Sequence, residues 1–121
     1  VRILRLVNVC DVGTPINPAI VETQISGAAV MQLGFTMTEE MVLRDGQLTN
    51  GSFADYKIPG FGDLPLTMEN AVVPAEQRNG PFGAKGVGES GTFGVSPAIA
   101  NAIDDAVGVR ITTMPITPEA V

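Results

Sequence analysis

The spacing of apolar residues along this chain predicts three strands, one hairpin and two helices. The opening run, residues 1–10, is apolar except at two arginines and one asparagine, which favours a strand covered on both faces. Residues 66–73 alternate well enough for a second strand, and residues 109–113 form a closing strand. Between the first two, apolar side chains recur every fourth position, as on one face of a helix. That stripe consists of Val21, Ile25, Ala29, Leu33, Met37 and Met41.

Both helices are expected to begin at a residue whose side chain caps free amides, followed by a proline. Asn17–Pro18 has this pattern, and Ser96–Pro97 repeats it. The first helix is placed at residues 18–41. The second is placed at residues 97–107, because Gly108 is suited to end it.

The remaining signals complete the layout. Residues 44–47 are typical of a hairpin turn. Gly27 and Gly34 each cost a helix about 1 kcal/mol relative to Ala, so another part of the protein is expected to approach that face closely. The elements together predict an α+β fold for residues 1–121, a single two-layer domain with a mixed β-sheet packed by two helices.

Composition excludes several classes of function. The net charge of −6, without a basic cluster, argues against a nucleic-acid partner. No apolar run approaches the ~20 residues that a membrane span needs. With no histidine and a single cysteine, the chain offers no zinc or non-haem iron site of the usual ligand types, so no metal ligand is expected in it. Cys10 lies among apolar neighbours and is expected to be a buried, inert thiol.

The stretch with the most chemical character is Gly83–Phe93, in which glycines surround one carboxylate, Glu89, and one ammonium, Lys85. A carboxylate fixed by such a turn can serve as a general base, and it can equally be an exposed turn residue; spacing alone leaves both open. Residues 86–91 also satisfy G-x-G-x-x-G, but no apolar strand precedes them, so the dinucleotide-binding interpretation is rejected. A phosphate-binding P-loop is rejected because its full motif is absent.

A series of motifs in one order carries a more specific resemblance. They are Asp11-Val12-Gly13, Ile16-Asn17-Pro18, Gln24-Ile25, Asp55-Tyr56-Lys57-Ile58-Pro59, Gly83-Ala84-Lys85-Gly86-Val87-Gly88-Glu89, Ala100-Asn101-Ala102-Ile103 and Met114-Pro115. Over nearly all its length the chain resembles the C-terminal part of the molybdopterin-binding subunit of the molybdenum hydroxylases. That family includes xanthine dehydrogenase, aldehyde oxidase and carbon monoxide dehydrogenase.

The resemblance implies roles for six residues. Glu89 matches the catalytic glutamate, the base that takes a proton from the hydroxyl that attacks the substrate carbon. Gln24 matches a residue that contacts the pterin, although a glutamine bonded to neighbouring backbone is the plainer alternative. Lys85, Gly86, Val87 and Gly88 are expected to run alongside the cofactor. Lys85 could instead be a surface cation or a partner of Glu89.

The resemblance also implies cofactors and partners. The cofactor would be a molybdopterin-type molybdenum cofactor, with the cytosine dinucleotide form left open. Iron–sulfur clusters and FAD are expected on other domains or subunits, and the remainder of the molybdopterin subunit is the expected partner. The substrate would be a small aldehyde or N-heterocycle. The protein is expected in the cytoplasm, with the periplasm as the alternative. The isolated 121 residues are expected to be inactive.

Three alternatives remain beside that interpretation. One is a non-catalytic module that binds a pterin or a partner by itself. Another is a fragment of a carbon monoxide dehydrogenase-type subunit. The third is a purely structural domain, for which Gln24 and Glu89 would both be replaceable. Ser90-Gly91 follows Glu89 where many purine-oxidising members have Pro-Pro, which disfavours a strict xanthine dehydrogenase.

Overall fold

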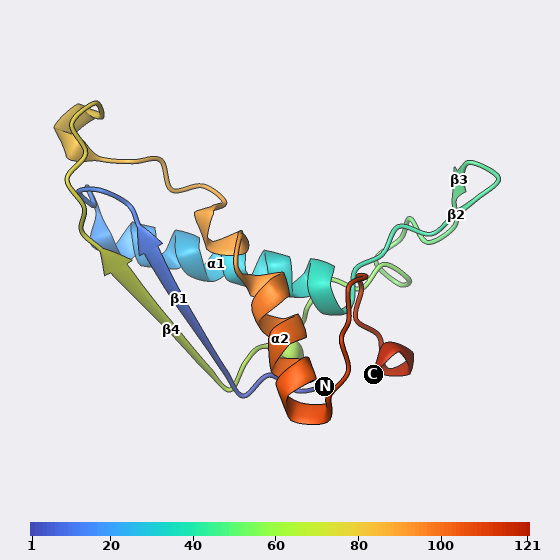
Figure 1. Cartoon of the computed structure of the whole chain (residues 1–121). Helices are drawn as coiled ribbons and strands as arrows, with labels where there is room; N and C mark the ends of the chain where they lie inside the picture. Colours follow the sequence, from blue (N-terminus) through green and yellow to red (C-terminus); the bar gives the residue numbers. More distant parts are fainter.

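The computed structural model describes all 121 residues and contains two α-helices, four strands and four short 3-10 helices. In chain order the elements are β1 (Arg5–Asp11), α1 (Pro18–Met37), β2 (Leu43–Arg44), β3 (Gln47–Leu48), β4 (Thr67–Val73) and α2 (Val95–Val107) (Figure 1). The α+β fold class is confirmed. Neither helix combines the length and the apolarity that a bilayer crossing requires.

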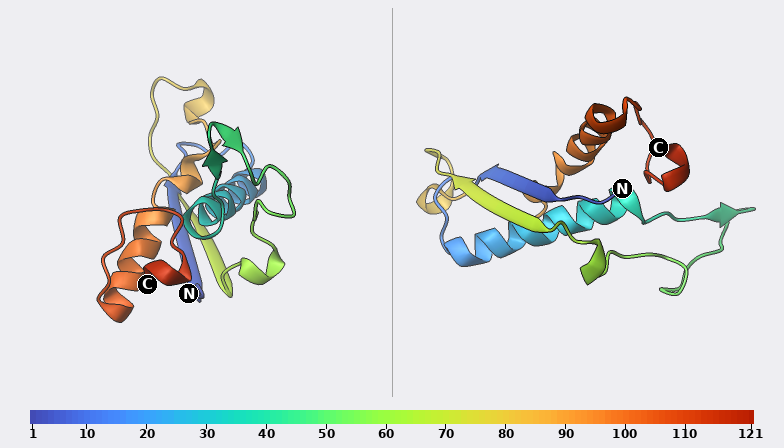
Figure 2. Two further views of the ribbon diagram at one scale, coloured as in Figure 1. Left: turned by 90° about the vertical axis from the view of Figure 1, so that its right-hand side faces the viewer. Right: turned by 90° about the horizontal axis from the view of Figure 1, so that it is seen from below.

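The strands form two separate small sheets instead of one. β1 pairs with β4 in parallel, with Arg5 opposite Thr67 and Asp11 opposite Val73. β2 and β3 form an antiparallel hairpin whose turn residues, Asp45 and Gly46, both have positive φ. The long helix α1 runs beneath the β1–β4 pair, and α2 lies on the β1 side of the pair, away from β4 (Figures 1 and 2). The hairpin extends away from this body beyond the end of α1.

Helix α1 begins where the sequence predicts and ends earlier. The side chain of Asn17 accepts a hydrogen bond from the amide of Ile20 at 3.2 Å, and Pro18 occupies the first helical position. The apolar stripe faces the core, and its members Ile25, Ala29 and Leu33 are at most 2% exposed. Ala29 and Leu33 belong to the larger cluster of buried side chains, and Ile25 belongs to a smaller one with Cys10 and Val12. The predicted end near residue 41 is wrong.

The helix stops at Met37 because the chain turns back onto its own last turn. The amides of Thr38 and Glu39 both donate to the carbonyl of Gly34. A Cβ on Gly34 would collide with Glu39 and lie 2.8 Å from Pro59, so the predicted close approach is confirmed there. It is wrong for Gly27, where a Cβ would meet no atom within 4 Å.

Helix α2 starts two residues before its predicted beginning, and Ser96 does not cap it. Gly94 occupies the cap position, while the Ser96 hydroxyl accepts a hydrogen bond from Gln32 Nε2 at 2.6 Å and lies 2.7 Å from the hydroxyl of Thr36. Thr36 is fully buried, so this cluster joins α1 to α2 with hydrogen bonds inside the core.

The buried Thr36 hydroxyl gives a stability prediction. We expect Thr36→Val to lower the free energy of unfolding by about 1–3 kcal/mol, because the hydroxyl contacts of Gln32 and Ser96 are lost without new space being made. Thr23→Val is the matched control, since Thr23 is exposed and bonds only to the helix carbonyl of Ala19. Urea unfolding of both variants measures the difference; equal effects would contradict a stabilising role for the cluster.

The two ends of the sequence differ most from the prediction. Residues 109–113 form no strand, and the segment instead passes α1, where the amide of Ile116 donates to the carbonyl of Thr36 at 2.6 Å. The opening strand is not covered on both faces either. Its even-numbered side chains face the core, but Val7 and Val9 are 46% and 59% exposed. Cys10 is buried as predicted, and this burial raises the pKa of its thiol.

Candidate functional site

The loop of residues 83–89 is fixed against the end of β1 by backbone contacts. The amide of Thr14 donates to the carbonyl of Gly83 at 2.8 Å, and the amide of Lys85 donates to the carbonyl of Val12 at 3.0 Å. Gly13 has φ +62°, and a Cβ there would collide with the Gly83 carbonyl. Only glycine therefore permits this approach of the two segments.

Lys85 reinforces the same junction with its side chain. Its ammonium lies 2.6 Å from Oδ2 of Asp11, while Oδ1 of Asp11 accepts the amide of Gly13 at 2.9 Å. These two hydrogen bonds, with the Lys85 bond the larger cause, hold the pKa of Asp11 below its ordinary value of 3.8. The expectation that Lys85 could pair with Glu89 is wrong, because Asp11 takes the ammonium. The sequence indicated Asp11 only as part of a motif and did not predict that it pairs with Lys85.

The lowered pKa of Asp11 predicts how stability depends on pH. A carboxyl group whose folded pKa lies below its unfolded value contributes stability above about pH 3.8, and the contribution is lost as the pH falls through the folded value. We therefore expect Asp11→Asn to lower the unfolding midpoint at pH 7 and to converge with wild type well below pH 3.8. Urea titrations at stepped pH measure this. A difference that stays constant down to pH 2 would contradict it.

A long-range hydrogen bond connects the beginning of α1 to the same loop. Gln24 Nε2 donates to the carbonyl of Gly88 at 2.9 Å, across 64 residues of sequence. Two residues after Glu89, Gly91 is buried against α1, where a Cβ would lie 2.7 Å from the carbonyl oxygen of Ile25 and 3.1 Å from Ala28 Cβ. The structure thus brings Gln24 and the Glu89 loop together, and Gly91 is a residue that sequence reasoning missed for this purpose.

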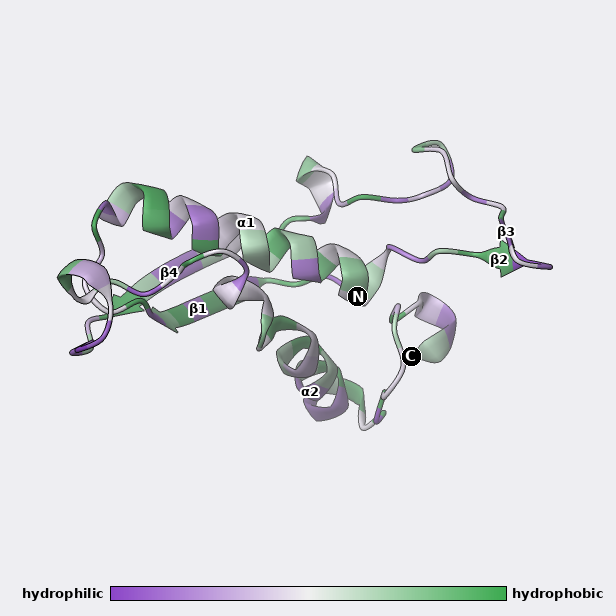
Figure 3. Ribbon diagram, turned by 90° about the horizontal axis from the view of Figure 1, so that it is seen from above, coloured by the Kyte–Doolittle hydropathy of each residue, from purple (hydrophilic) through white to green (hydrophobic).

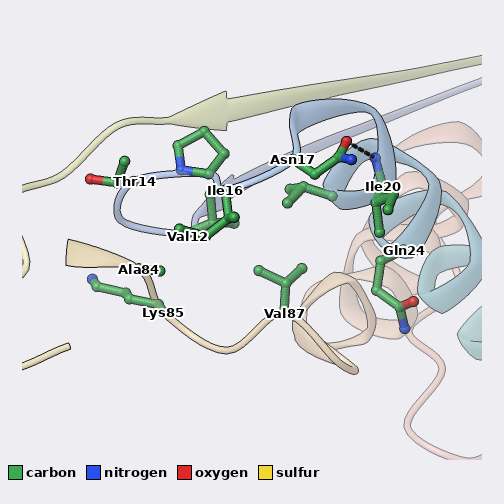
Figure 4. Close-up of a pocket in the computed structure, with 11 residues that line it drawn as sticks. Val12, Thr14, Ile16, Asn17, Ile20, Gln24, Ala84, Lys85 and Val87 are labelled. Carbon is green, nitrogen blue, oxygen red and sulfur yellow. Dashed lines mark hydrogen bonds between the residues drawn. The ribbon is translucent and has the colours of Figure 1, made fainter. Parts of the chain in front are cut away.

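A cavity of about 260 Å³ opens between the turn after β1, the first turns of α1 and the loop (Figure 4). Three predicted site residues line it, namely Gln24, Lys85 and Val87. The rest of its wall is mostly apolar and consists of Val12, Thr14, Pro15, Ile16, Asn17, Ile20, Val21 and Ala84. Gly86, Gly88 and Glu89 are exposed next to this cavity in the chain but do not line it.

The loop presents unpaired hydrogen-bonding groups at its surface. The backbone amides of residues 86–89 donate to no acceptor in the chain. Gly86 and Gly88 have open space where a Cβ would stand, so another molecule can contact their backbone directly. The carboxylate of Glu89 is exposed and forms no hydrogen bond or ion pair with the protein. The loop can therefore offer a row of donors ending in one free carboxylate.

Comparison with known proteins identifies the family of the chain. The profile of the molybdopterin cofactor-binding domain family matches residues 1–65, more than half of the chain. The chain belongs to this family. It is a piece of the molybdenum hydroxylase type, as the resemblance implied.

Relatives of known structure and function agree with the assignment. The chain is 41% identical, over 99% of its length, to the gamma subunit of the 6-hydroxypseudooxynicotine dehydrogenase complex of Paenarthrobacter nicotinovorans. It is 38% identical, over 97% of its length, to the aldehyde oxidoreductase molybdenum-binding subunit PaoC of Escherichia coli. It superposes on quinoline 2-oxidoreductase from Pseudomonas putida 86 with a TM-score of 0.91, at 38% identity and over 98% of its length. It spans only 16% of each of these three chains.

Proposed function

We propose that this chain contributes the catalytic glutamate and part of the cofactor-binding surface of a molybdenum-cofactor oxidoreductase. The observation that carries the proposal is the row of free amides at residues 86–89, fixed by Gln24 on one side and by Lys85 on the other. The proposed enzyme hydroxylates an aldehyde or N-heterocycle with oxygen derived from water.

The residues of the loop fit a molybdopterin-type cofactor. Its pterin ring and phosphate carry several hydrogen-bond acceptors, and the unpaired amides of residues 86–89 are donors that could bind such groups. The open backbone of Gly86 and Gly88 permits close contact. Gln24 has a side-chain oxygen that remains available while its amide nitrogen binds Gly88. The ammonium of Lys85 is paired with Asp11, so we assign Lys85 the role of positioning the loop.

Glu89 is proposed as the general base of the reaction. When bound, the molybdenum supplies acidification of the attacking hydroxyl and accepts the electrons of the oxidation. The task of Glu89 is to accept the proton of that hydroxyl, which requires a carboxylate with no competing partner in the protein. The Glu89 carboxylate has no such partner. A positioned general base of this kind typically raises the rate of a reaction by roughly 10² to 10⁴-fold.

The names of two relatives support the proposed substrate classes. PaoC is a subunit of an aldehyde oxidoreductase, and quinoline is an N-heterocycle, so both substrate classes remain candidates. We propose that iron–sulfur and flavin domains or subunits complete electron transfer, with the remainder of the molybdopterin subunit as the direct partner. We propose a molybdopterin-type cofactor, and its cytosine dinucleotide form is one candidate.

The proposal is tested on the protein as isolated from its native source. Molybdenum and pterin are measured per mole of this chain, and intact mass spectrometry identifies every chain that elutes with it. We expect about one molybdenum per chain together with a longer parent polypeptide or a larger subunit. A metal-free monomer of this chain alone would overturn the proposal and favour the non-catalytic module.

A further inference from the structure

Two asparagines of the chain are directly followed by glycine, at Asn50-Gly51 and at Asn79-Gly80. This dipeptide is chemically labile, because glycine has no side chain to shield its amide nitrogen, and that nitrogen can attack the side-chain carbonyl carbon of the asparagine. The structure holds the two asparagines in different ways, so it predicts different fates for them.

The side-chain amide of Asn50 is bonded at both ends. Its Oδ1 accepts a hydrogen bond from the amide of Val42 at 2.9 Å, and its Nδ2 donates to the carbonyl of Glu40 at 2.6 Å. These bonds connect the two sides of the β2–β3 hairpin at its base. The side chain cannot turn its carbonyl carbon toward the amide of Gly51 until both bonds break.

Asn79 is free of such contacts. It is exposed, and its side chain forms no hydrogen bond with the protein. The amide of Gly80, which would be the attacking group, donates to no acceptor in the chain. Figure 3 shows the colour of hydrophilic residues at the tip of the loop that follows β4, where residues 76–79 lie. Exposed polar loop tips of this kind are where a chain is most readily modified.

The fold requires glycine beside Asn79. A Cβ on Gly80 would collide with the carbonyl oxygen of Ala84. The carbonyl of Gly80 also accepts the amide of Gly83 at 3.1 Å, and the carbonyl of Gly83 in turn accepts the amide of Thr14 at 2.8 Å. The labile pair therefore lies directly before the junction that attaches the loop of residues 83–89 to the turn after β1.

We infer that Asn79 is a site of spontaneous deamidation whose product loosens this junction, whereas Asn50 is protected by its two hydrogen bonds. The deprotonated amide nitrogen of Gly80 forms a bond to Cγ of Asn79, the bond from Cγ to Nδ2 breaks, and the nitrogen leaves as ammonia with the proton. Water then opens the five-membered imide at either carbonyl and gives aspartate or isoaspartate. Isoaspartate adds one methylene group to the main chain directly before Gly80, in a turn that has no room for a Cβ at that glycine.

Peptide mapping of the protein purified from its native source and aged in neutral buffer tests the site. Mass spectrometry with fragmentation that distinguishes aspartate from isoaspartate counts both products at each asparagine. We expect conversion at Asn79 to be at least about tenfold faster than at Asn50, because two hydrogen bonds must break before the Asn50 side chain can turn. Equal rates, or a faster rate at Asn50, would overturn the inference.

The same measurement in guanidinium chloride separates the effect of the fold from that of the local sequence. In the unfolded chain both side chains are free, so we expect the two rates to become similar. If the difference is as large in the unfolded chain as in the folded protein, neighbouring residues cause it, and the protection of Asn50 by its hydrogen bonds is overturned.

Amide hydrogen exchange tests the effect on the junction. The amides of Thr14 and Lys85 donate to the carbonyls of Gly83 and Val12. We expect both to exchange at least about fivefold faster in the fraction that contains isoaspartate than in fresh protein, as for the loss of one hydrogen bond. Unchanged exchange in that fraction would overturn the loosening.

Asn79→Gln is the matched control. Glutamine keeps the side-chain amide but would have to close a six-membered ring, which is much slower, so aged and fresh samples of this variant should exchange alike. Equal acceleration in the variant would overturn the assignment to Asn79. Neither measurement requires turnover or bound molybdenum, so this inference and the proposed function are tested separately: a molybdenum-loaded protein in which Asn79 stays intact overturns the inference alone.

Discussion

Glu89→Gln in the complete enzyme is expected to lower kcat by about 10² to 10⁴-fold and to leave the molybdenum and pterin content unchanged. Glutamine keeps the size of the side chain and its hydrogen-bonding capacity but cannot accept the proton. The folded loop is held by Gln24, Lys85 and Gly91, none of which contacts the Glu89 carboxylate, so the substitution should not release the loop. Steady-state kinetics with an aldehyde and an N-heterocycle, together with metal analysis, measure both effects.

Glu40→Gln is the matched control for this experiment. Glu40 is exposed, and its carboxylate likewise has no partner in the protein, but it lies after the end of α1 near the hairpin. We expect its kcat to equal that of wild type. A Glu89→Gln enzyme with full cofactor content that retains more than about a tenth of wild-type kcat would refute the role of general base.

Local signals predicted the helices well because their causes are local. Asn17 and Pro18 start α1 through contacts within one turn, and the apolar stripe follows directly from helical periodicity. The predicted end of α1 was wrong because contacts of Gly34 with Glu39 and with the distant Pro59 decide where the helix ends. Ser96 was misassigned as a cap because its hydroxyl bonds to Thr36, which lies 60 residues earlier.

The candidate site shows the same division. The glycine-rich loop and Glu89 were visible in the sequence as unusual chemistry. Their contact with Gln24 spans 64 residues, and the ion pair of Lys85 with Asp11 spans 74, so neither could follow from spacing. The resemblance placed Gln24 near the cofactor, but the hydrogen bond that joins it to the loop emerges only from the fold.

Gly91→Ala is expected to have the second-largest effect, on stability and activity together. The added Cβ would lie 2.7 Å from the carbonyl oxygen of Ile25, a helix backbone atom that cannot move without disturbing α1. We expect the free energy of unfolding to fall by about 1–3 kcal/mol, as for overpacking in a core. The loop that carries Glu89 should also shift away from α1, and a misplacement of about 1 Å can cost ~10²-fold in rate.

Gly27→Ala provides a control of opposite sign, since it makes the same chemical change at an open position of α1, the helix against which Gly91 packs. Gly27 is exposed and has open space at Cβ, so alanine there should raise the free energy of unfolding by up to about 1 kcal/mol through its helix propensity. Urea unfolding and kcat of both variants provide the comparison. If Gly91→Ala stabilises the protein as Gly27→Ala does, and kcat is unchanged, the packing of Gly91 on Ile25 does not position Glu89. If Gly91→Ala lowers both quantities while Gly27→Ala raises stability and leaves kcat intact, close packing of the loop on α1 holds the base where the reaction needs it.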